Sequence, residues 1–75
     1  MATEGGQVTG TKDKDYNLIW FTEACLSNTL TLETYIDDAE REGDEELATF
    51  FRKAQSESRK GGEQGKDMLR QRLAG

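Results

Sequence analysis

The sequence contains no histidine and no proline, and only one cysteine among its 75 residues. Without histidine, and with Cys25 as the only thiol, the chain alone cannot assemble the nitrogen and sulfur ligand sets of zinc, haem or copper sites. A single cysteine also excludes an intramolecular disulfide. Because proline would interrupt a helix, its absence is compatible with long helices. Carboxylates are therefore the only side chains left for a metal site.

Long hydrophobic runs are also absent. The longest apolar run, Leu18 to Phe21, is too short for the core of a signal peptide or for a membrane span, and no basic segment precedes it. We therefore expect a cytoplasmic protein without membrane contact. The net charge of −5 argues against a nucleic acid as partner, because phosphate binding requires a basic surface.

A helical period is present in two segments separated by Gly43. Apolar and small residues recur at spacings of three and four, which is typical of amphipathic helices. The two stripes are Leu18, Phe21, Cys25, Asn28, Leu32, Tyr35 and Ala39, then Leu47, Phe51, Ala54, Ser58, Gly61, Gly65 and Met68. Gly43 suits the left-handed residue after a helix, and Asp44 suits the first cap of the next. The sequence predicts an all-α fold with helices over 15–42 and 44–73, a turn at Gly43 and a flexible tail over 1–14.

The two stripes also match each other if the chain folds back at Gly43. Each residue of the first stripe then faces one residue of the second, and the two residue numbers of every such pair add up to the same total. This constant total predicts an antiparallel two-helix hairpin. In this register Cys25 faces Gly61, and the two polar members, Asn28 and Ser58, face each other as a polar level of the core that can satisfy its own hydrogen bonds. Charge favours the same pairing: residues 15–42 contain seven acids and one base, whereas residues 44–73 contain six acids and seven bases.

The glycines of the second segment leave one alternative open. Gly61, Gly62 and Gly65 each cost a helix interior about 1 kcal/mol relative to alanine, so the helix could end near Gly61. We favour a continuous helix because the stripe resumes in phase at Met68.

A lone hairpin of this size buries too little surface to be stable by itself. Several apolar residues lie off both stripes and widen the apolar face beyond what one partner helix can cover. These candidate dimer-surface residues are Ile19, Leu26, Leu30, Ile36, Phe50 and Leu69. We expect a homodimer that completes a four-helix bundle.

The segment from Tyr35 to Glu57, with its acidic turn and the run Glu45-Glu46-Leu47-Ala48, resembles the middle of a rubrerythrin-type hairpin of the ferritin-like superfamily. The resemblance implies a bundle whose interior holds two metal ions, bound by Glu from one helix and Glu-x-x-His from the next. Here the first of these positions falls on Asn28. The Glu-x-x-His pair falls on Ser58 and Gly61. The resemblance thus implies the frame of the family without its metal ligands.

Three functions follow as expectations. The favoured one is a small non-enzymatic homodimer without a cofactor, which serves as a protein-interaction or accessory module for itself or for another, unidentified protein. The second is a ferritin-like oxidoreductase or iron-handling protein that holds iron or manganese through carboxylates alone, with Glu33, Glu57 and Glu63 as candidates. The third is a small-molecule binder that uses a glycine-lined gap between the helices. The gap would be bordered by Phe21, Cys25, Gly61 and Gly65.

The mapped ligand positions generate a first prediction. Replacing Asn28 with Glu should not restore metal binding, because Ser58 and Gly61 still offer no ligand. Metal content after incubation with iron and desalting, compared with the unmodified protein, measures this. Stoichiometric iron in the single variant would show that the ligand positions are wrongly assigned.

Overall fold

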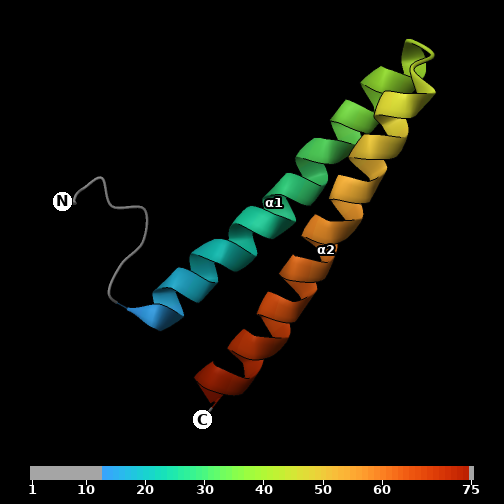
Figure 1. Ribbon diagram of the computed structural model, residues 1–75. Helices are drawn as coiled ribbons and strands as arrows, with labels where there is room; N and C mark the ends of the chain where they lie inside the picture. The colour runs from blue at the N-terminus through green and yellow to red at the C-terminus, as the bar shows by residue number, and fades with distance from the viewer. Residues whose placement is uncertain (1–12, 75) are drawn as a thin grey trace, which may run out of the picture.

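The computed structural model describes residues 13–74, which form two antiparallel α-helices joined by a short turn (Figure 1). Helix α1 is Lys14–Arg41 and helix α2 is Glu45–Ala74. The prediction of an all-α helical hairpin is confirmed. The expected tail over 1–14 lies outside the described residues, apart from Asp13 and Lys14, which begin the helical part.

Side-chain caps determine where α1 begins. The carboxylate of Asp13 accepts hydrogen bonds from the backbone N–H groups of Asp15 and Tyr16 at 3.0 and 3.1 Å. These N–H groups have no partner within the helix, so the cap stabilises its first turn.

The turn between the helices is closed by two backbone hydrogen bonds. The N–H of Gly43 donates to Glu40 O at 3.0 Å, and that of Asp44 donates to Ala39 O at 2.9 Å. Gly43 has φ of +74°, the left-handed conformation that this type of helix end requires. Asp44 also accepts from Leu47 N at 3.1 Å and so caps α2. Because Glu42 and Asp44 serve as caps, α1 ends one residue before its expected limit at the turn, and α2 begins one residue after its expected limit.

The helices meet along two heptad series, here called the seam. Every residue buried between the helices belongs to it, and its members are spaced alternately by three and four, as in a coiled coil. The seam consists of Asp15, Leu18, Thr22, Cys25, Thr29, Leu32, Ile36 and Ala39 on α1 with Ala48, Phe51, Gln55, Ser58, Gly62, Gly65, Leu69 and Arg72 on α2. Its buried apolar side chains lie near the turn, small or polar residues fill its middle, and Leu18 and Leu69 are half-buried at the other end.

The seam is rotated from the stripes expected on the sequence. Leu18, Cys25, Leu32 and Ala39 belong to both, but Phe21 is 56% exposed and lies only at the edge of the interface. The expected inner positions that are instead exposed are Phe21, Asn28, Tyr35, Leu47 and Met68. The stripe prediction followed one three-and-four series of apolar and small residues, whereas the closest approach of the helices, at Gly62 and Gly65, turns a partly different series inward.

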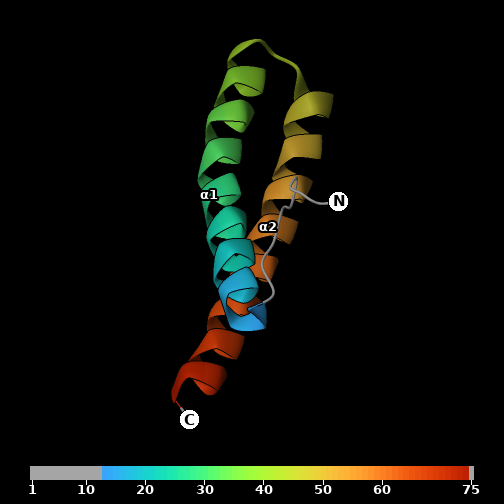
Figure 2. The ribbon, with the colours of Figure 1, turned by 90° about the vertical axis from the view of Figure 1, so that its left-hand side faces the viewer.

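Glycines allow this close approach. A β-carbon on Gly62 would lie 2.5 Å from Leu26 Cδ2, and one on Gly65 would overlap the Thr22 hydroxyl and lie 3.0 Å from Thr22 Cβ. Helix α2 runs unbroken through Gly61 and Gly62. Seen from the side, the two helices cross toward the end away from the turn, here called the open end (Figure 2).

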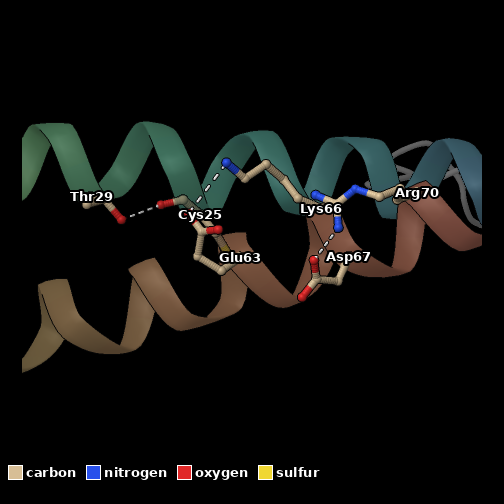
Figure 3. Close-up of polar contacts among 6 residues, drawn as sticks. All are labelled: Cys25, Thr29, Glu63, Lys66, Asp67 and Arg70. Atoms are coloured by element: carbon tan, nitrogen blue, oxygen red, sulfur yellow. Dashed lines mark hydrogen bonds and ion pairs between the residues drawn. The ribbon is translucent and has the colours of Figure 1, made fainter.

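The polar seam residues Thr22, Thr29 and Gln55 satisfy their hydrogen bonds locally or across the hairpin, whereas Asp15 Oδ1 is buried without a hydrogen-bond partner, 3.7 Å from the Arg72 guanidinium. The hydroxyls of Thr22 and Thr29 donate to the carbonyls of Leu18 and Cys25 at 2.8 and 2.9 Å (the second in Figure 3). Gln55, which is 9% exposed, donates from Nε2 to Thr29 O at 3.0 Å. Burial of these groups therefore leaves no orphaned donor.

The contact at Gly65 generates a prediction about stability. Gly65→Ala should lower the free energy of unfolding by about 1–3 kcal/mol through overpacking against Thr22, even though alanine favours a helix. Urea unfolding at fixed protein concentration measures the change.

Gln64→Ala, one residue earlier on the exposed side of α2, is the matched control and should have little effect. Adding Thr22→Ala to Gly65→Ala should recover stability, because it removes the atoms that collide. A Gly65→Ala variant more stable than the parent would contradict the close approach.

Candidate interaction surface

The seam separates two flanks of different chemistry. Each helix contributes two heptad series to the seam. The positions that precede the first series lie on one side of the interface, and the positions that follow the second series lie on the opposite side. One side is the apolar flank, formed by Phe21, Asn28, Tyr35, Leu47, Ala54, Gly61 and Met68. The other is the charged flank, formed by Glu33, Glu40, Arg52, Arg59 and Lys66. The seven apolar-flank positions carry no charge, and the same heptad series on α1 ends in a charged residue on either side, Lys14 and Glu42.

Contacts between the helices hold the apolar flank in place. The rings of Tyr35 and Phe51 lie with centroids 5.4 Å apart, and Phe21 lies against Gly61, where an added β-carbon would be 3.6 Å from its Cζ. Asn28 Nδ2 donates to Ser58 Oγ at 2.8 Å. The Asn28–Ser58 contact therefore exists, but Asn28 is exposed, so the expectation that this pair forms a level of the core is wrong for the hairpin.

Two open grooves lie on the apolar flank, one at each end of the hairpin. The groove near the turn is lined by Tyr35, Asp38, Ala39, Glu42, Asp44, Leu47 and Phe51. The groove near the open end is lined by Lys14, Asn17, Leu18, Met68 and Arg72. Both have apolar floors. The charged side chains at the turn groove are all acidic, whereas those at the open-end groove are both basic.

The charged flank is already occupied by polar contacts near the turn. Arg52 pairs with Glu40, and Gln55 Nε2 donates to Glu33 Oε1 at 2.9 Å. Toward the open end its α1 positions, Ile19 and Leu26, are apolar, whereas Arg59 and Lys66 of α2 remain charged.

The expected dimer-surface residues do not form one surface. A groove on the open-end part of the charged flank includes four of them, Ile19, Leu26, Leu30 and Leu69. Phe50 is 64% exposed near the turn and lies beside Phe51, with ring centroids 5.7 Å apart. Ile36 is only 5% exposed because it occupies a seam position, so its assignment to the dimer surface is wrong.

The three candidate metal-binding carboxylates are separated. Glu33 accepts from Gln55, Glu57 lies 3.9 Å from Lys60 Nζ, and Glu63 lies 3.5 Å from Lys66 Nζ (Figure 3). Within residues 13–74, no group of three or more Asp, Glu, Cys or His side chains is placed to hold a metal ion.

The expected glycine-lined gap is filled. Cys25 Sγ lies 3.0 Å from the β-carbon position of Gly61, and the Thr22 side chain occupies that of Gly65. The hypothesis that a small molecule binds there has no support in this geometry.

No known protein family, curated protein sequence or solved structure matches this chain. In the part that the structure describes, neither helix has an apolar stretch long enough to cross a bilayer.

Sequence reasoning missed Gln55, which connects two polar groups of α1 across the seam. A signal was available in the sequence. Thr22, Thr29 and Gln55 belong to a second series with spacings of three and four, and each of them follows a stripe residue by one position. It was overlooked because these residues are polar.

The Gln55 contacts generate a prediction. Gln55→Glu replaces a donor with an acceptor that faces Thr29 O and the Glu33 carboxylate, and should cost about 2–4 kcal/mol of stability at neutral pH. Burial beside a like charge would raise the pKa of the new carboxyl in the folded state, so stability should recover as acidification protonates it.

Urea unfolding at two pH values, compared with the nearly isosteric Gln55→Met, checks this. Equal loss in the two variants at both pH values would contradict the proposed repulsion.

Proposed function

We propose that this chain is a non-enzymatic interaction module that acts as a homodimer, two hairpins completing a four-helix bundle. One observation carries the proposal: over the middle of the hairpin the helices meet through small and polar residues, while most of the large apolar side chains lie outside. Residues 13–74 bury only four hydrophobic side chains, those of Leu32, Ile36, Ala39 and Ala48.

The exposed apolar groups are too large and too many for a free surface. They are Tyr16, Ile19, Trp20, Phe21, Leu30, Tyr35, Leu47, Phe50, Met68 and Leu73. Burial of a large apolar side chain contributes about 1.5–3 kcal/mol, so a second body that covers several of them adds the stability that the hairpin lacks. A second copy of the chain is the one partner that accompanies it without further assumption, and symmetric dimers are the commonest oligomers.

The absence of an enzymatic role is part of the proposal. Asn28 and Ser58, which occupy positions where the ferritin-like resemblance would put ligands, bind each other and offer no carboxylate. The frame would then serve as a scaffold or accessory subunit for itself or for another protein, without iron or manganese.

Self-association provides the test. Light scattering should give twice the 8.4 kDa chain mass, and the melting temperature should rise with protein concentration, because dissociation accompanies unfolding. The same samples, incubated with iron and manganese and desalted, should contain no stoichiometric metal. A folded monomer would refute the homodimer, and a dimer with one or two metals per pair would favour the oxidoreductase instead.

A further inference from the structure

We infer that the second copy packs on the apolar flank with its turn at the opposite end, related by a two-fold axis that passes beside Asn28. This inference rests on the proposed homodimer and specifies its geometry.

The apolar flank is symmetric about one level of the hairpin. On α1, Phe21 and Tyr35 lie seven residues before and after Asn28. A two-fold axis perpendicular to the helices at Asn28 therefore brings Phe21 of each copy onto Tyr35 of the other, aromatic on aromatic.

The same holds on α2. Leu47 and Met68, two long aliphatic side chains, are equally distant from the point between Glu57 and Ser58, and so are the small residues Ala54 and Gly61. The hydrogen bond from Asn28 to Ser58 places the two midpoints at one level. A single axis therefore pairs large with large and small with small on both helices.

Charge distinguishes this arrangement from a dimer whose turns share one end. Residues 37–46 contain seven acids and one base. A same-end dimer would place two such acidic turns together. In the opposite-end dimer, the acid-lined groove of Asp38, Glu42 and Asp44 meets the partner's groove lined by Lys14 and Arg72.

The outermost flank positions follow the same rule. Lys14 and Glu42 lie fourteen residues on either side of Asn28 and carry opposite charges. Each Glu42 would therefore face Lys14 of the other copy.

Disulfide cross-linking tests the axis. Asn28→Cys in a Cys25→Ser background should form a disulfide-linked dimer under mild oxidation, because the two new cysteines face each other across the axis within the reach of a disulfide. Leu30→Cys in the same background is the matched control. It lies two residues on, points to the other side of α1 and is 75% exposed. Asn28→Cys should cross-link about tenfold faster or more.

The outcomes separate the two proposals. If light scattering shows dimers but Asn28→Cys does not cross-link faster than Leu30→Cys, the inferred geometry is overturned and the homodimer remains. If the parent chain is a folded monomer, both proposals fall.

Charge exchange tests the orientation. Lys14→Glu and Glu42→Lys should each weaken the dimer about threefold to tenfold, and the double variant should restore its affinity. Both substitutions suit the helix ends that carry them, so neither should unfold the chain. In a same-end dimer, Glu42→Lys would relieve repulsion and tighten association, so an increase in affinity would overturn the inference.

Discussion

The closest approach of the two helices, at Gly62 and Gly65, controls the remainder of the arrangement. Because the side chains of Leu26 and Thr22 lie against the backbone of α2 there, positions 62 and 65 have no room for a side chain of their own. The seam at this level is therefore built from small and polar groups such as Thr22 and Ser58. Phe21 and Met68 are displaced onto a flank. The hairpin has a well-determined register but little apolar burial, and its stability depends on what covers that flank.

The two flanks differ in what it would cost to cover them with a second hairpin. On the charged flank near the turn, Glu40 and Arg52 pair within the hairpin, so a second hairpin packed there would have to remove both charges from water. The centre of the apolar flank carries no such cost, because its ion pairs, Asp38 with Arg41 and Asp15 with Arg72, lie at its two ends. Its central residues supply burial, while the end charges select orientation. Affinity and specificity are thus assigned to different residues of one surface.

The sequence was sufficient for the hairpin because its local signals agree: Asp13 and Asp44 as caps, Gly43 as the left-handed residue, and helical periodicity on both sides. It was also sufficient for neighbours across the interface, such as Tyr35 with Phe51 and Cys25 with Gly61. It failed on which side of each helix is buried. Periodicity weighs residues by hydrophobicity, whereas the close approach at Gly62 and Gly65 sets which side of each helix faces the other, so Thr29 and Gln55 are inside and Tyr35 is partly outside. Ile36 was misplaced for the same reason.

The turn uses Asp44 twice, since its N–H closes the last turn of α1 and its carboxylate caps the first turn of α2. A longer, flexible linker would allow α2 to rotate about its axis independently of α1. Here Asp44 is bonded both to the last turn of α1 and to the first turn of α2. The rotational phase of α1 is therefore transmitted through the turn to α2. Since each residue advances a helix by about 100°, the length of this turn determines which residues of α2 share a side with Tyr35. The turn therefore fixes the rotation of the two helices relative to each other, and with it which side chains of α2 contribute to the apolar flank.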